Sequence, residues 1–263
     1  PQRVARKAGA RPGDLLRLPT PLGTGMITTA AKGGAAGPAH LEAAIRSMLQ
    51  LNRRAAELAQ QVEVQAMTDI TGFGLLGHGC EMAEASGVAL RFVVDRLSFL
   101  PGAQEYAGQS LFPGGTCNNQ RTYQDLIAFH GLDEEMQMLL LTPETSGGLL
   151  IALSPAAAER YEDLCRAFGQ DVWRVGEVLD GSGLDPLAAA VTAPSRLKPL
   201  LPGSVTGLVG APSTARSIAA WRPLLPGCAT AMRGRSAVHG AIELREAVIT
   251  RRSAVSLPRP ASP

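Results

Sequence analysis

The chain has 263 residues, of which 45% are hydrophobic, 18% charged and 4% aromatic, and its formal net charge is +2. This composition predicts a folded protein with an aliphatic core and argues against disorder throughout. The four cysteines lie far apart without a CxxC pair, which argues against a zinc ribbon or a disulfide framework. The cysteine usage favours a reduced, cytoplasmic compartment.

The sequence predicts no membrane association. No apolar run approaches the ~20 residues that a membrane-spanning helix needs, and no apolar signal region follows the charged N-terminus. The first residue is Pro1 rather than Met, so we expect a fragment or a processed product.

In chain order, the first predicted element is a short strand over 13–18, which leads into a glycine-rich turn at 21–25. A helix is predicted over about 39–61, where apolar residues recur near helical spacing. A short apolar stretch at 64–67 is predicted to be a strand.

A second helix is predicted to begin within 68–78 and to end at Gly87, a typical residue after a helix C-terminus. A third helix is predicted from Pro155 to about Phe168, with Ser154 as its N-cap. Further strands are predicted at 88–94, 139–141, 149–153 and 173–179. Because strands and helices alternate without a strict βαβ repeat, we expect an α+β fold with a mixed sheet flanked by helices.

The last part of the chain differs in charge and pattern. From residue 191 onward ten Arg or Lys residues face two acids, a net +8, whereas residues 1–190 carry −6. Residues 185–263 lack a sustained period, and we expect a disordered tail with a marginal local helix at 238–249. One tryptophan, Trp221, and no clustered basic stripe argue against nucleic-acid binding.

Asp69 is the most informative polar residue. An acid just before a glycine-rich helix start can hold Mg²⁺ while nearby backbone N–H groups face phosphate. From the pattern alone, we favour an N-cap that satisfies free helix N–H groups, because this is the more frequent explanation.

Other polar residues have a structural interpretation that we favour. His78 is flanked by apolar residues, which is typical of a packed, hydrogen-bonded histidine. Cys80 and Cys117 have no basic partner nearby in sequence, and Lys32 is interpreted as a solvated loop lysine. The glycine clusters match no phosphate-loop motif and individually indicate tight turns and close packing. These clusters are Gly23/Gly25, Gly72/Gly74/Gly77, Gly114/Gly115 and Gly147/Gly148.

Five segments in order resemble the selenophosphate synthetase (selenide, water dikinase) family. The segments are 21–30 (PLGTGMITTA), 68–78 (TDITGFGLLGH), 100–103 (LPGA), 112–119 (FPGGTCNN) and 143–150 (PETSGGLL). The resemblance covers roughly residues 11–180. Related superfamily members, such as thiamine-phosphate kinase and aminoimidazole ribonucleotide synthetase, carry different residues at the position of 71–74.

The resemblance implies the C-terminal domain of an aminoimidazole ribonucleotide synthetase-like fold. It implies an ATP- and Mg²⁺-dependent enzyme, a homodimer at full length, that makes selenophosphate from selenide with AMP and orthophosphate as the other products. The family's Mg²⁺ ligand maps to Asp69, which favours the metal role. Ile70 replaces the family's more usual Val.

The family's nucleophilic Cys or selenocysteine and its neighbouring Lys belong to an N-terminal loop that this sequence does not contain. No catalytic residue is therefore assigned in this chain, and we expect the isolated chain to be inactive. The expected organisation is a linker or N-terminal-domain remnant at 1–10, the C-terminal domain at 11–184 and the tail at 185–263. Two alternatives stay open: an inactive binding or scaffolding module, and a related ATP-dependent kinase or synthetase.

Overall fold

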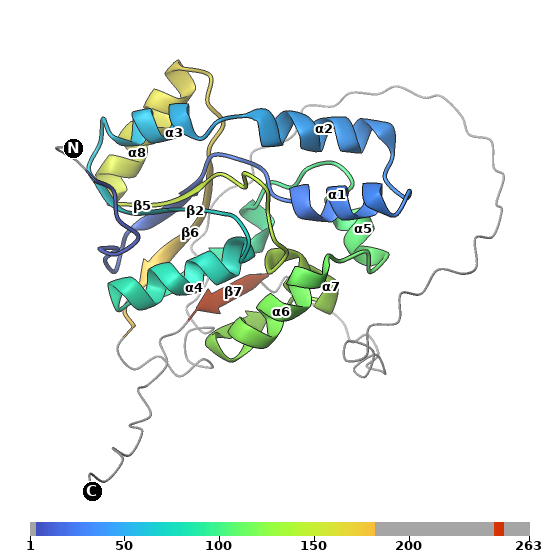
Figure 1. The fold of residues 1–263 in the computed structure, drawn as a ribbon. Helices are drawn as coiled ribbons and strands as arrows, with labels where there is room; N and C mark the ends of the chain where they lie inside the picture. Colours follow the sequence, from blue (N-terminus) through green and yellow to red (C-terminus); the bar gives the residue numbers. More distant parts are fainter. Residues whose placement is uncertain (1–3, 182–244, 250–263) are drawn as a thin grey trace, which may run out of the picture. The chain divides into compact units, whose positions relative to one another are not determined.

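The structure is a computed structural model that describes residues 4–181 and 245–249 of the chain (Figure 1). Within these residues, strands form one sheet in the order β2-β5-β1-β6-β3-β7-β4. The strands are β1 (Leu15–Leu18), β2 (Val64–Asp69), β3 (Ala89–Val93), β4 (Ile127–His130), β5 (Leu149–Leu153), β6 (Trp173–Leu179) and β7 (Glu246–Ile249).

Eight α-helices and two short 3₁₀ turns accompany the sheet in the described ranges. They are α1 (Thr24–Lys32), α2 (Pro38–Leu49), α3 (Arg53–Ala59), α4 (Gly74–Ser86), η1 (Val94–Arg96), α5 (Ala103–Gly108), α6 (Gly114–Tyr123), η2 (Gln124–Leu126), α7 (Glu134–Leu140) and α8 (Pro155–Ala167). The predicted α+β class is confirmed. The strand pairs are all antiparallel, so the sheet is not mixed, and a parallel bridge joins only Leu22 and Phe99.

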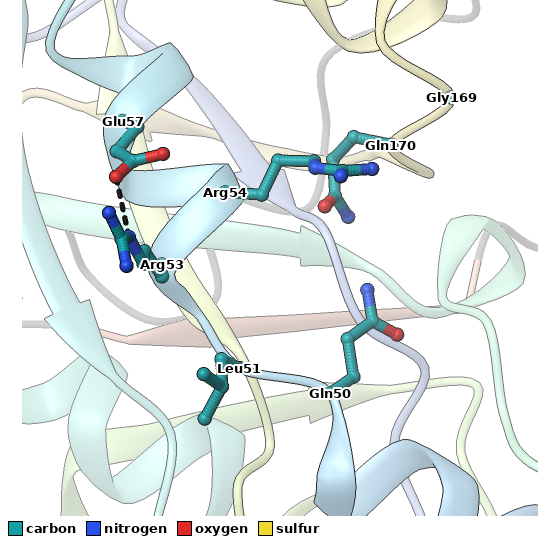
Figure 2. A pocket seen from close by; sticks show the side chains of 7 residues that line it. All are labelled: Gln50, Leu51, Arg53, Arg54, Glu57, Gly169 and Gln170. Atoms are coloured by element: carbon teal, nitrogen blue, oxygen red, sulfur yellow. Dashed lines mark hydrogen bonds and ion pairs between the residues drawn. The ribbon is translucent and has the colours of Figure 1, made fainter.

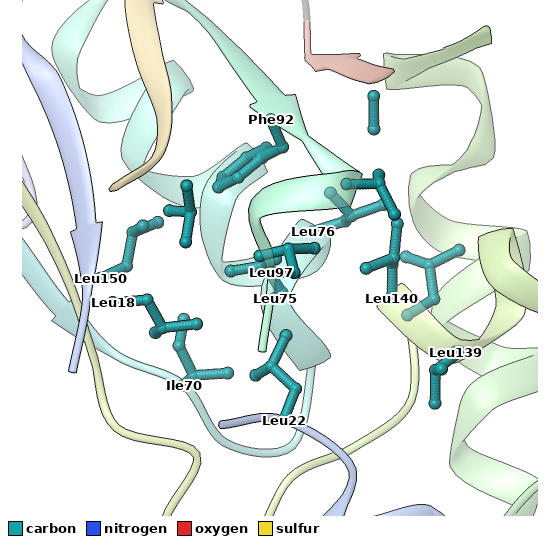
Figure 3. Close-up of a cluster of buried hydrophobic side chains, with 14 of the residues drawn as sticks. Leu18, Leu22, Ile70, Leu75, Leu76, Phe92, Leu97, Leu139, Leu140 and Leu150 are labelled. Atoms are coloured by element: carbon teal, nitrogen blue, oxygen red, sulfur yellow. The ribbon is translucent and has the colours of Figure 1, made fainter. Parts of the chain in front are cut away.

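Two apolar cores lie on opposite faces of the sheet, and β5 contributes to both. Leu150 and Ala152 join the larger core with residues of α1, α4, α5 and α7 (Figure 3). Leu149, Ile151 and Leu153 belong to the second core with residues of α3 and α8, which lie side by side (Figure 1). This alternation is the period of two that a strand imposes, and burial of each such side chain is worth about 1.5–3 kcal/mol.

The boundaries of several predicted elements are confirmed by local chemistry. Helix α4 ends at Gly87, which adopts the left-handed φ of 68°. Helix α8 begins after Ser154, whose hydroxyl accepts a hydrogen bond from the Ala157 amide at 3.4 Å. Both ends follow the capping rules that the sequence suggested.

Two predictions in the first 181 residues are corrected. The single helix predicted over 39–61 is two helices, α2 and α3, separated at Gln50, which has an extended backbone. The strand predicted at 139–141 is instead the end of α7. The Asp133 side chain accepts the Met136 amide at 2.9 Å and caps this helix, and an apolar run of three residues cannot by itself distinguish a strand from a helix end.

Strand β7 corrects the prediction for part of the tail. The sequence predicts a local helix at 238–249, but Glu246–Ile249 is a buried strand that pairs with β3 on one side and β4 on the other. The helix prediction is therefore wrong for these four residues, because their partners are distant in sequence. Residues 185–244 and 250–263 of the predicted tail lie outside the described residues.

Candidate functional site

Three of the five motif segments meet at one end of the sheet, where β1 and β2 end and β5 begins. We call residues 20–25, 69–74 and 142–148 the motif junction. In the β2–β5 pair, Asp69 lies opposite Leu149. The Ile70 amide donates to the Gly148 carbonyl at 2.9 Å, and the Gly147 amide donates back to the Ile70 carbonyl at 3.0 Å.

Glu144 joins the motif junction to the start of α1. Its buried carboxylate accepts hydrogen bonds from the Gly23 amide at 2.7 Å, the Thr24 amide at 2.8 Å and the Thr24 hydroxyl at 2.6 Å. The positive end of the α1 dipole therefore faces a carboxylate of the protein itself. Burial raises the pKa of Glu144 to about 7, and the hydrogen bonds from Thr24 and Gly23 oppose that rise.

The two remaining motifs also contact the junction. The Leu100 amide donates to the Leu22 carbonyl at 2.8 Å. The Asn119 side-chain amide, on α6, donates to the carbonyls of Gly72 and Leu141, both at 2.9 Å. All five motifs, which are spread over more than a hundred residues of sequence, are thus in contact.

Close backbone packing explains most of the motif glycines. A side chain at Gly25 would overlap the Pro143 carbonyl, and one at Gly74, whose φ is 68°, would overlap the backbone of residues 140–142. In contrast, a side chain at Gly72 or Gly114 would meet no atom within 4 Å. The structural interpretation is confirmed for Gly25 and Gly74, whereas the fold gives no steric reason for glycine at Gly72.

Asp69 is the last residue of β2, and its side chain is exposed. Its carboxylate makes no hydrogen bond or ion pair with any described residue. The N-cap of α4 is Phe73, four residues later, so the alternative N-cap role of Asp69 is wrong. Within residues 4–181 and 245–249, no group of three or more His, Cys, Asp or Glu residues is arranged so that it could hold a metal ion.

His78 is buried on α4 and hydrogen-bonded, as the structural interpretation predicts. Its Nε2 lies 3.0 Å from the Thr71 hydroxyl, and its Nδ1 lies 3.2 Å from a Glu81 carboxylate oxygen. The Phe73 ring lies against the imidazole with ring centroids 5.2 Å apart.

The other sequence candidates, Cys80, Cys117 and Lys32, lie on helices but outside the motif junction. Cys80 is buried, and burial raises the pKa of its thiol to about 12, which disfavours a reactive thiolate. Lys32 is exposed at the C-terminal end of α1, opposite the end that contacts Glu144. Cys117 is half-buried on α6.

A surface hollow of about 500 Å³ lies where α2 meets α3, beside the loop after α8 (Figure 2). Arg53 and Glu57 pair across one turn of α3 at 2.7 Å, and Arg54 extends toward the Gly169–Gln170 loop. None of the residues that line this hollow belongs to the motif junction.

No described helix is long and apolar enough to cross a membrane.

The family model for the AIR synthase related protein, C-terminal domain, matches residues 11–187. The chain belongs to this family. It is 41% identical over 179 residues to the selenide, water dikinase of Geobacter metallireducens, covering 68% of this chain and 52% of that protein. It is 43% identical over 162 residues to the enzyme of the same name from Trichlorobacter lovleyi, covering 62% and 47%.

The selenophosphate synthetase resemblance that the motifs suggested is therefore confirmed, and this AIR synthase related chain spans about half the length of the curated relatives it matches. Among solved structures, it is similar to thiamine-monophosphate kinase from Stenotrophomonas maltophilia. That similarity has 19% identity and a TM-score of 0.47, and it covers 67% of this chain and 51% of the other.

Sequence reasoning missed Glu144 and Asn119 as organising residues of the junction. Both belong to segments that carried the resemblance, but no local sequence pattern around either residue predicts its hydrogen-bond partners. Their partners are 120 and 47 residues away, at Thr24 and Gly72, so only the folded chain brings them together.

Proposed function

We propose that this chain is the C-terminal part of a selenide, water dikinase. In this proposal the complete enzyme makes selenophosphate from selenide and ATP and releases AMP and orthophosphate. The main support is the 41% identity over 179 residues to an enzyme of that name. The contact of all five resemblance motifs around one sheet end supports a single site rather than scattered matches.

We propose Asp69 as one ligand of Mg²⁺. Its carboxylate is exposed and has no partner among the described residues, so it is available to a cation. Mg²⁺ usually takes only one or two protein carboxylates and completes its shell with phosphate oxygens and water. One carboxylate fits that pattern, and the ion would supply positive charge that offsets the charge of the ATP phosphates.

The remaining residues of the motif junction hold the backbone around Asp69. Ile70, the next residue, is fixed by its two backbone hydrogen bonds to the 147–148 turn. The Glu144 amide donates to the Thr71 carbonyl at 2.9 Å, which ties the same loop to the start of α1. This packing holds the Asp69 backbone in place without using its carboxylate.

The proposed activity needs groups outside this chain. The resemblance assigns the nucleophile and its neighbouring Lys to an N-terminal loop, and the chain spans about half of its relatives. We therefore expect the chain alone to be inactive toward ATP and selenide. A homodimer and a cytoplasmic location remain predictions.

The test compares the chain alone with a fusion in which the N-terminal half of the Geobacter metallireducens relative precedes it. AMP release is measured with ATP, Mg²⁺ and selenide. We expect selenide-dependent AMP from the fusion and none from the chain alone. AMP release by the chain alone would contradict the division of the site, and a folded but inactive fusion would favour the scaffolding alternative.

A further inference from the structure

His78 faces two groups whose hydrogen-bonding roles are fixed. The Glu81 carboxylate, 3.2 Å from Nδ1, accepts hydrogen bonds when ionised, and the Phe73 backbone amide, 3.5 Å from Nε2, donates only. An acceptor at Nδ1 and a donor at Nε2 fit the tautomer that carries its proton on Nδ1. These two roles together describe a neutral imidazole protonated at Nδ1.

This tautomer also fixes the Thr71 hydroxyl. Nε2 lies 3.0 Å from the Thr71 oxygen, so an unprotonated Nε2 accepts its shorter hydrogen bond from the Thr71 hydroxyl and shares the same lone pair with the Phe73 amide at 3.5 Å. The Thr71 carbonyl accepts amides from Gly74 at 3.0 Å and Glu144 at 2.9 Å. Thr71 is thus held through its side chain by α4 and through its backbone by the motif junction.

Further contacts hold the two residues beside His78, Glu81 and Phe73, in place. Lys7 lies 3.5 Å from the same Glu81 oxygen that faces Nδ1, and this ion pair holds the carboxylate beside the imidazole. The Phe73 ring contacts the His78 ring on one side and makes an edge contact with Tyr123 on the other, at 5.9 Å.

We propose that His78 is a positioning residue for loop 71–73: as the Nδ1-protonated neutral tautomer, it orients Thr71 and Phe73 beside Asp69. The loop needs such support, because Gly72 is exposed with open space where a side chain would lie, and Phe73 is 43% exposed. The consequence for Mg²⁺ rests on the proposed function, whereas the tautomer and the loop order do not.

The first test is long-range ¹H–¹⁵N NMR of the full chain labelled at histidine. The chain has four histidines, and a His78→Gln variant assigns the resonances. We expect a protonated Nδ1 and an unprotonated Nε2 at His78. A protonated Nε2 would overturn the proposal.

The second test separates acceptor function from packing. His78→Gln places an amide oxygen near the Nε2 position, whereas His78→Leu fills space without an acceptor. We expect exchange of the Phe73 amide hydrogen to be about fivefold faster in His78→Leu than in the wild type and near wild type in His78→Gln. Equal exchange in all three would overturn the positioning role.

Glu81→Gln and Glu84→Gln form a matched pair, because only Glu81 contacts the imidazole and both sit on α4. A glutamine at 81 can donate or accept, so we expect His78 to show both tautomers in Glu81→Gln. In Glu84→Gln we expect His78 to keep the Nδ1-protonated tautomer.

In the fusion enzyme, His78→Leu should raise the Mg²⁺ concentration for half-maximal rate, and His78→Gln should give a value near that of the wild type. If tautomer and exchange follow the prediction but Asp69→Asn leaves Mg²⁺ dependence unchanged, the Mg²⁺ assignment fails and the positioning role of His78 stands.

Discussion

Two carboxylates of the motif junction have opposite surroundings. Glu144 is buried and accepts three hydrogen bonds at the start of α1, whereas Asp69 is exposed and has no partner in the described part of the chain. The first has a structural environment and the second an environment open to a ligand. Substitutions at these two residues should therefore affect different properties.

At Asp69 we predict a loss of activity without a loss of stability. In the fusion enzyme, Asp69→Asn should lower the turnover rate at limiting Mg²⁺ by tenfold or more, because loss of about 1.4 kcal/mol of transition-state stabilisation is already tenfold. The melting temperature should be unchanged, since the carboxylate is exposed and makes no hydrogen bond or ion pair with a described residue. Near wild-type turnover at limiting Mg²⁺ would contradict the metal role.

At Glu144 we predict a stability that depends on pH. Burial raises the pKa to about 7 from 4.5, so between these values the folded state holds a proton that the unfolded state releases. Protonation of Glu144 therefore contributes to the free energy of unfolding below pH 4.5. This contribution, on the order of 3 kcal/mol, is lost as the pH rises through 7.

Urea unfolding of the wild type and Glu144→Gln at pH 5 and pH 8 measures this effect. The glutamine variant cannot titrate at this position, so the other groups cancel in the difference. The wild type should lose stability relative to the variant as the pH rises. The raised pKa would be contradicted if the stability of the wild type relative to Glu144→Gln were the same at pH 8 as at pH 5, or higher.

At the scale of elements, the sequence predicts those whose partners are local. The strand at 149–153 and the helix after Ser154 follow from apolar spacing and a capping residue, and both occur. The run at 139–141 and the residues 246–249 fail for a shared reason. Their conformation is decided by the Asp133 cap of α7 and by the flanking strands β3 and β4, which short-range periodicity does not contain.

The candidate site divides in the same way. The position of Asp69 before a glycine-rich helix start is visible in the sequence, and so is the buried character of His78. The anchoring roles of Glu144 and Asn119 are not visible, because each bonds to a segment distant in sequence.

Strand β7 makes a prediction about truncation. It lies between β3 and β4, and all four of its residues are buried. A chain that ends after residue 190 should therefore melt several degrees below the full chain, since each kcal/mol shifts the melting temperature of a domain this size by about 2–4 °C.

A chain that ends after residue 249 keeps β7 and is the control. Val248→Asp in the full chain places a carboxylate in a fully buried position and should lower the melting temperature in the same direction. An unchanged melting temperature after truncation at 190 would show that β7 does not stabilise the sheet.

At the scale of the whole molecule, the chain accounts for about half of the relatives it resembles. Its described part places five motifs around one sheet end, with one exposed acid among them. The proposed reaction also needs the groups that the resemblance assigns to an N-terminal half. The function is therefore testable only when both halves are present.

The most direct test is ³¹P NMR of the fusion enzyme with ATP, Mg²⁺ and selenide. The account predicts selenophosphate, AMP and orthophosphate in equal amounts, with no reaction when the chain is present alone. Formation of ADP as the nucleotide product, or phosphate release that does not depend on selenide, would contradict the account and favour a related kinase of the same superfamily.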